Sequence, residues 1–125
     1  MGKPGHTGIR RIILATRFSA QGLCYAWKNE SAFRQEISLS VLLTPAAFWL
    51  GRSATEVLAL LVPLALVLIV ELLNSAIEAT VDRISDKKHA LAGSAKDMGS
   101  AAVFISLLVV AGVWGTIAWQ RFGAV

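Results

Sequence analysis

The chain has 125 residues, of which 55% are hydrophobic and 16% charged, and its formal net charge is +4. A soluble domain of this size has too little interior to bury so much apolar surface, so the composition excludes a soluble enzyme, a disordered regulator and a disulfide-stapled secreted domain. A single cysteine, Cys24, also excludes an internal disulfide and a metal site built from several thiolates.

Residues 8–28 carry the periodicity of an amphipathic helix. Apolar and small residues recur at steps of three and four within an arc of about 120°, whereas Arg10, Arg17 and Lys28 lie off that arc. The positions on the arc are Ile9, Ile12, Ile13, Thr16, Ala20, Leu23, Cys24 and Trp27. The pattern predicts a basic helix on the inner surface of a membrane, where cations meet anionic lipid. A helix packed on other helices of the same assembly is an equally good interpretation.

Three later stretches have the length and composition of membrane spans, which need about 20 helical residues. They are residues 31–51, residues 55–84 with a cytoplasmic extension, and residues 92–121. The first is long enough only if its helix begins near Ser31, whereas Met98 to Trp119 in the third carry no charge. The sequence therefore predicts an all-α membrane protein, with one surface helix and three transmembrane helices in a single domain.

The cations predict the orientation of these spans. They gather before the first span and between the second and third: Lys3, Arg10, Arg11, Arg17, Lys28 and Arg34, then Arg83, Lys87, Lys88 and Lys96. By the positive-inside rule the N-terminus and the second loop are cytoplasmic, and the first loop and the C-terminus lie outside. Trp27 suits the inner interface, and Trp49 and Trp119 suit the outer one. Cations interrupt the start of the chain, so we expect no secretory signal.

A polar stripe runs along the second span. Its members are Glu71, Asn74, Ser75, Glu78 and Asp82, which share about 100° of one helical face. A carboxylate at membrane depth is costly, so Glu71 is expected to face protein or a water cavity and to exchange protons there. Asn74 and Ser75 are equally well explained as hydrogen-bonding contacts between helices. Asp82 is as well explained by a local pair with Arg83 as by a role in chemistry.

The segment GSAKDMGS precedes the third span and places Lys96 beside Asp97. The two could simply begin a helix, since an acid suits the first helical turn. Together with the acidic stripe and the basic loop, however, they match what a nucleotide with Mg²⁺ requires. The sequence has no P-loop and no Gly-rich kinase loop.

Three strings in the chain resemble the small integral-membrane diacylglycerol kinases of bacteria. They are AWKNESAFRQE at 26–36, VELLNSAIEATVDRI at 70–84 and HALAGSAKDMGSAAV at 89–103. The resemblance covers nearly the whole chain. It implies a homotrimer in the bacterial inner membrane, with active sites shared between subunits, that phosphorylates diacylglycerol to phosphatidic acid with MgATP in phospholipid turnover. It implies no nucleic-acid partner.

The resemblance also implies catalytic roles, position by position. Glu71 matches the general base that takes the proton of the lipid hydroxyl. Asn74 would orient Glu71 or the metal shell, and Lys96 would steady the phosphates and offset developing charge. Glu30 and Glu78 match the carboxylates that hold Mg²⁺, the cofactor that accompanies ATP.

Two sets of binding residues follow from the same resemblance. The nucleotide positions are Arg11, Phe18, Glu30, Glu78, Lys87, His89, Lys96 and Asp97. The lipid-substrate positions are Ser19, Ser31, Arg34, Glu36, Glu71 and Ser100. For Ser19 and Glu36 a structural role is an equal alternative. Phe18 departs from the family pattern because it stands where a tyrosine can occur, and we interpret the extra cations Lys87 and Lys88 as inside-positive charge.

Three other functions would each explain part of the sequence. An undecaprenol kinase uses the same catalytic stripe, but AFRQE and KDMGSA look closer to the diacylglycerol branch. A small proton- or ion-translocating subunit could use Glu71 but explains neither Glu30 nor the pair Lys96 and Asp97. A non-catalytic scaffold would use small-residue spacings such as Ala95/Gly99 and Ala111/Gly115 for close helix packing, and leaves the buried acids without a purpose.

Overall fold

The computed structural model describes residues 7–85 and 87–123, so Lys3 lies outside the described residues. The described chain is helical throughout, which confirms the all-α class. Its elements are α1 (Gly8–Asn29), α2 (Ser31–Leu50), α3 (Ala54–Ile84), α4 (Ala90–Ala118) and a final π-helical turn, η1 (Trp119–Gly123).

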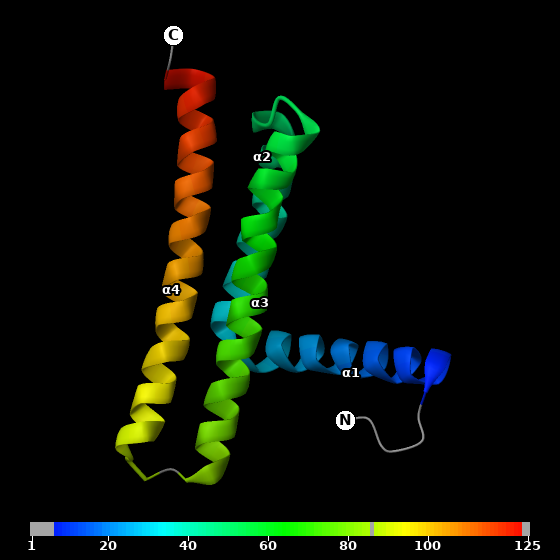
Figure 1. Cartoon of the computed structure of the whole chain (residues 1–125), viewed down its shortest axis with the longest axis vertical. Helices are drawn as coiled ribbons and strands as arrows, with labels where there is room; N and C mark the ends of the chain where they lie inside the picture. Colours follow the sequence, from blue (N-terminus) through cyan, green and yellow to red (C-terminus); the bar gives the residue numbers. More distant parts are fainter. Residues whose placement is uncertain (1–6, 86, 124–125) are drawn as a thin grey trace.

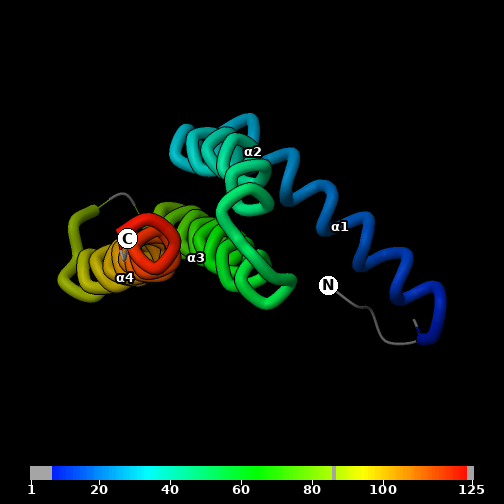
Figure 2. Tube along the Cα trace, turned by 90° about the horizontal axis from the view of Figure 1, so that it is seen from above, coloured from blue at the N-terminus to red at the C-terminus, as the bar shows by residue number. Residues whose placement is uncertain are grey.

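The helices α2, α3 and α4 run side by side, and α1 projects crosswise from the foot of α2 (Figure 1). Seen from above, α3 stands between α2 and α4, and α1 extends away from all three (Figure 2). The α3–α4 connection lies at the end of the bundle near α1, and the α2–α3 turn lies at the opposite end with η1 (Figure 1). Trp49 and Trp119, which close α2 and open η1, therefore belong to the same end, as the aromatic pattern predicts.

Two helical segments are long and apolar enough to cross a membrane by length and composition. They are Ala54–Ile84, with a mean hydropathy of 2.6, and Ala90–Gly123, with 2.2. The helix α2 falls short because charged residues occupy its first turns and leave a brief apolar run. Two of its hydroxyls are satisfied within the helix: Ser38 donates to the Arg34 carbonyl over 2.8 Å and Thr44 to the Ser40 carbonyl over 2.7 Å. Such internal bonds suit an apolar environment.

Apolar packing concentrates at the end of the bundle opposite α1. Ala47, Leu50, Leu60 and Ile117 form a buried cluster there that joins α2, α3 and α4. The indole Nε1 of Trp114 donates to the Leu60 carbonyl over 3.0 Å, which adds a directional tie between α3 and α4. The other half of α3 buries polar residues instead.

Large apolar side chains cover the outside of the bundle. Leu42 is 73% exposed, Leu73 61% and Phe104 62%, on α2, α3 and α4 respectively. A single chain in water would leave far more contiguous apolar surface than soluble monomers expose. Together with the two long apolar segments, these faces describe a membrane protein.

Candidate functional site

Two polar residues of α3 are buried where α2, α3 and α4 run side by side. Glu71 is 5% exposed and Asn74 8% exposed, one helical turn apart on the same face. The apolar residues around them on α3, such as Leu73 and Ile77, point outward. The prediction that Glu71 faces protein is therefore confirmed.

The amide of Asn74 makes one hydrogen bond and one close packing contact. Its Nδ2 donates to Oε1 of Glu78 over 3.0 Å. Asn74 therefore contacts a predicted metal ligand. Its Oδ1 is buried and has no hydrogen-bond partner among the described residues 7–85 and 87–123. A Cβ at Gly99 of α4 would collide with that Oδ1, so α4 approaches Asn74 this closely only because residue 99 is glycine.

Two more carboxylates, Glu30 between α1 and α2 and Glu36 within α2, are near enough to Glu71 for charge to act between them. Glu30 is the single residue between these helices, ending one and preceding the other. Its charge and that of Glu78 both act on Glu71, and the charge of Glu71 acts in turn on Glu36 of α2. We call Glu30, Glu36, Glu71, Asn74 and Glu78 the acidic group. Carboxylates brought together in this way repel one another, so a cation among them would offset the repulsion.

The side-chain geometry of the acidic group is compatible with a magnesium ion but does not enclose one. Oxygen ligands are what Mg²⁺ prefers, and it usually takes one or two protein carboxylates together with phosphate oxygens and water. Within residues 7–85 and 87–123, no group of three or more His, Cys, Asp or Glu side chains is close enough to hold a metal ion. Among the described residues, Glu30 and Glu78 therefore offer carboxylate ligands but no complete metal site.

The lower end of the polar stripe meets α4. Nζ of Lys96 lies 2.7 Å from Oδ1 of Asp82, so this ion pair joins α3 to α4. Asp82 therefore pairs across the helices rather than with its neighbour Arg83. Both side chains keep substantial exposure, 44% for Lys96 and 64% for Asp82, which leaves the pair open to exchange for a phosphate.

Basic residues surround a cavity of about 520 Å³ beside this ion pair. Lys87, Lys88 and His89 line it together with Asp82 and Lys96. His89 caps the start of α4, where its Nδ1 accepts a hydrogen bond from the backbone N–H of Leu91 over 3.1 Å. Asp97 follows on α4 and is exposed. The α3–α4 end therefore has the charge that phosphates require.

A second cavity of about 520 Å³ lies in the angle between α1 and α3. Ser19 and Glu30 contribute polar groups to it, and its other walls, which include Leu23 and Leu72, are mostly apolar. Arg34 fixes the corner that shapes this cavity, because its Nη1 donates to the Trp27 carbonyl over 2.7 Å. An amphiphile with an apolar tail and a small polar head has the matching chemistry.

The remaining predicted site residues lie apart from the acidic group in one chain. Arg11 and Phe18 are exposed on α1, and the half of that helix with Arg11 projects away from the bundle (Figure 2). Ser31 and Ser100 are also exposed, at the start of α2 and on α4. A single chain therefore does not gather every position that the sequence nominates.

Sequence reasoning missed two contacts at this site. The Asp82–Lys96 pair joins residues on different helices, and no periodicity within one helix indicates it. The fit between Gly99 and Asn74 had a partial signal, since the Ala95/Gly99 spacing already indicated close packing. The matching spacing at Gly115 has no such role in this chain, because a Cβ there would meet open space.

The chain is similar in sequence to known diacylglycerol kinases. The family model described as prokaryotic diacylglycerol kinase matches residues 17–118. Among curated proteins, the diacylglycerol kinase of Pseudomonas aeruginosa is 51% identical over 113 residues, 90% of this chain and 92% of its own length. That of Escherichia coli K12 is 50% identical over 117 residues (94% and 96%), and that of Haemophilus influenzae 49% identical over 111 residues (89% and 94%).

Proposed function

We propose that this chain, which belongs to the prokaryotic diacylglycerol kinase family, transfers the γ-phosphate of MgATP to the hydroxyl of diacylglycerol and so forms phosphatidic acid. Membership in this family makes the chain a kinase. The observation that carries the proposal for the site is the burial of Glu71 beside the Asn74–Glu78 hydrogen bond, on a helix that is otherwise apolar at this depth.

Glu71 acts as the general base. Its carboxylate accepts the proton of the lipid hydroxyl while the hydroxyl oxygen forms a bond to the γ-phosphorus. The bond between that phosphorus and the bridging oxygen of ATP breaks, and ADP leaves with the electron pair. Most of the acceleration in such a transfer comes from positioning and from electrostatic stabilisation of the phosphoryl oxygens, which the residues around Glu71 supply.

The nucleotide binds at the α3–α4 end. Lys96 exchanges Asp82 for phosphate oxygens, and the remaining contacts come from Arg11, Phe18, Lys87, His89 and Asp97. Glu30 and Glu78 hold Mg²⁺, which neutralises phosphate charge when it is bound. Asn74 keeps Glu78 in its ligand position through the 3.0 Å bond from Nδ2.

The lipid enters beside α1. The mostly apolar cavity between α1 and α3 receives the upper part of the acyl chains, with Ser19 at its rim. Glu36 and Arg34 approach from α2, and Ser31 and Ser100 complete the lipid contacts. In this arrangement the lipid hydroxyl lies beside Glu71, the general base of the acidic group.

The assembly is a homotrimer in the bacterial inner membrane. The helices α2, α3 and α4 are its three spans, α1 lies on the cytoplasmic surface, and the C-terminus lies outside. Two features support this layout: the cations gather at the α1 and α3–α4 end, and exposed apolar side chains cover α2, α3 and α4. The exposure of Asp97 and Ser100 suits active sites that neighbouring subunits share.

The deciding experiment measures transfer of labelled γ-phosphate from MgATP to diacylglycerol and to undecaprenol in mixed micelles. The parent chain is expected to label diacylglycerol. Glu71→Gln is expected to lose at least about a hundredfold in kcat, as removal of a positioned general base does, while still binding nucleotide. Glu56→Gln is the matched control, because Glu56 lies at the opposite end, where it pairs with Arg52.

Three results would contradict the proposal. Preferential labelling of undecaprenol would identify the wrong lipid, and full activity in Glu71→Gln would remove the base. Absence of labelling of either lipid by a folded parent chain would leave the family's chemistry without support in this member.

A further inference from the structure

A second polar cluster lies at the end of the bundle opposite the acidic group. Arg121 of η1 donates from Nη1 to the Leu50 carbonyl over 3.1 Å, across 71 positions of the chain. Its guanidinium carbon also lies 5.6 Å from the centre of the Trp49 ring and 5.7 Å from that of Phe122, and these two rings stack on each other. Two ring faces and one carbonyl therefore hold this guanidinium in place.

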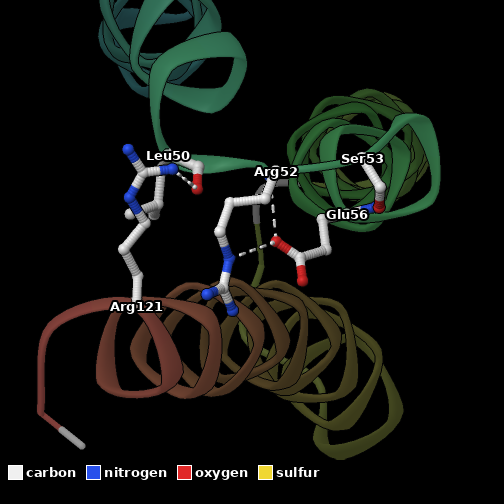
Figure 3. A network of polar contacts seen from close by, with 5 residues as sticks. All are labelled: Leu50, Arg52, Ser53, Glu56 and Arg121. Atoms are coloured by element: carbon white, nitrogen blue, oxygen red, sulfur yellow. Dashed lines mark hydrogen bonds and ion pairs between the residues drawn. The ribbon is translucent and has the colours of Figure 1, made fainter. Parts of the chain in front are cut away.

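Arg52 approaches the same place from the α2–α3 turn. Figure 3 shows Arg52 reaching from the turn towards α4, while Arg121 reaches from the α4 side towards the turn. Nε of Arg52 lies 3.7 Å from Oε1 of Glu56, and that oxygen also accepts the backbone N–H of Arg52 over 3.0 Å. The single carboxylate of this cluster is thus already engaged with Arg52.

The donors of these arginines are incompletely used. A guanidinium offers five N–H donors, and the hydrogen bond to Leu50 uses one of those on Arg121. Within residues 7–85 and 87–123, Arg121 forms no ion pair with a carboxylate. The cluster Arg52, Glu56 and Arg121 consequently carries one uncompensated positive charge. The charge lies beside the aromatic side chains of Trp49 and Phe122. Aromatic side chains are typical of the boundary between the hydrocarbon and the headgroups of a bilayer.

We propose that Arg52 and Arg121 bind the headgroup phosphate of an anionic phospholipid at this end of the bundle, apart from the catalytic site. Guanidinium groups are suited to phosphate because their planar forks donate paired hydrogen bonds to its oxygens. In this proposal the stacked rings of Trp49 and Phe122 pack beside the glycerol and the first acyl carbons. The inference takes from the proposed function only that this end reaches a membrane surface.

The geometry favours lipid binding over a purely structural link between the helices. A structural link would need only the bond between Arg121 and Leu50, whereas Arg52, from a different element, also reaches into the space between the turn and α4 (Figure 3). Arg52 and Arg121 are the two of the chain's 12 Lys and Arg residues that fall in the segments expected on the outer side.

The test uses the full chain in bilayers of phosphatidylcholine that contain brominated phosphatidylglycerol or, separately, brominated phosphatidylcholine. Bromine quenches tryptophan fluorescence on contact. In a Trp27→Phe background the remaining reporters are Trp49, Trp114 and Trp119, which lie towards this end of the bundle. The ratio of quenching by the two lipids measures the preference for the anionic headgroup.

The parent chain is expected to prefer phosphatidylglycerol. Arg52→Gln and Arg121→Gln should each reduce that preference roughly fivefold, the contribution of one arginine near a charged membrane surface. Arg83→Gln makes the same substitution at the other end of α3 and should leave the preference unchanged. Kinase activity is measured on the same samples, so loss of headgroup preference with activity intact separates this inference from the proposed function.

Three other results would each overturn the inference. Equal quenching by both lipids in the parent means that no anionic headgroup binds. Displacement of quenching by inorganic phosphate without any lipid preference means that the cluster binds free phosphate. A change of oligomeric size in Arg121→Gln means that the cluster is a contact between copies of the chain.

Discussion

The side chain of Asn74 shows how one residue couples two helices at the candidate site. Its Nδ2 holds Glu78 of its own helix, and its Oδ1 occupies the space that a side chain at position 99 of α4 would fill. An unpartnered acceptor at 8% exposure is costly, so it persists only where packing or a ligand's donor compensates it. Both halves of this amide therefore predict measurable effects.

Substituting Gly99 by alanine tests the packing half. The new methyl group collides with Oδ1 of Asn74, so overpacking should destabilise the chain by about 1–3 kcal/mol and displace the amide from Glu78. The midpoint of unfolding in detergent and the kinase rate measure the two effects. Gly93→Ala is the control, since open space surrounds its Cβ position; it should be neutral or stabilising by up to about 1 kcal/mol. Equal behaviour of both variants would refute the close approach.

Substituting Asn74 by alanine tests the hydrogen-bonding half. Loss of the bond from Nδ2 frees Glu78, so the apparent affinity for Mg²⁺ in the kinase assay should fall roughly 10–100-fold, as it does when a residue that orients a metal ligand is removed. Asn29→Ala removes an amide whose Nδ2 donates to the Tyr25 carbonyl of α1, and it should leave Mg²⁺ dependence unchanged. A Mg²⁺ dependence that is the same in both variants would argue against the role of Asn74.

At the scale of the elements, helix termini and corners decide where the site residues lie. Glu30 reaches α3 because the helix breaks there, between α1 and α2, and the bond from Arg34 to the Trp27 carbonyl holds that corner. At the opposite end, Ser53 begins α3 and its Oγ accepts the backbone N–H of Glu56 over 3.1 Å. A short capping contact thus sets the start of the longest helix.

The capping hydrogen bond of Ser53 can be compared with Thr7, which precedes α1 without such a bond. Ser53→Ala should destabilise the chain by about 1 kcal/mol, because an N-terminal N–H of α3 loses its acceptor. Thr7 precedes α1 without a side-chain cap bond, so Thr7→Ala should cost no more than a few tenths of a kcal/mol. Unfolding midpoints of the two variants measured side by side decide the matter, and a larger loss in Thr7→Ala would contradict the assignment.

At the scale of the whole molecule, one chain leaves several predicted site residues apart from the acidic group. The acidic group is assembled within it, but Asp97 and Ser100 lie on the exposed side of α4 and the apolar faces of the bundle remain uncovered. In the homotrimer that we propose, these exposed positions would meet a neighbouring chain, which would complete the nucleotide and lipid contacts.

Mixing inactive chains tests this arrangement. Glu71→Gln and Asp97→Asn are each expected to be inactive alone, and co-assembly of the two should restore part of the activity, because a mixed trimer contains a site with Glu71 and Asp97 both intact. Restoration is measured after dissociation and reassembly in detergent, with unmixed variants as controls. No restoration in assemblies of confirmed mixed composition would mean that each site forms within one chain.

The sequence predicts the properties that depend on spacing within one helix. Periodicity and apolar runs determine the all-α class and the common face of Glu71, Asn74 and Glu78. The cost of an exposed carboxylate among apolar neighbours further requires that Glu71 be covered by protein, and its 5% exposure agrees.

Only the tertiary structure decides which helices supply the partners. The acidic group needs Glu30 and Glu36 to reach α3, Lys96 finds Asp82 on another helix, Gly99 makes room for Asn74, and Arg121 bonds to Leu50 across 71 positions. Helical periodicity states which side chains share a face. Which faces meet depends on side-chain packing between segments remote in sequence, and a local pattern carries no record of that packing.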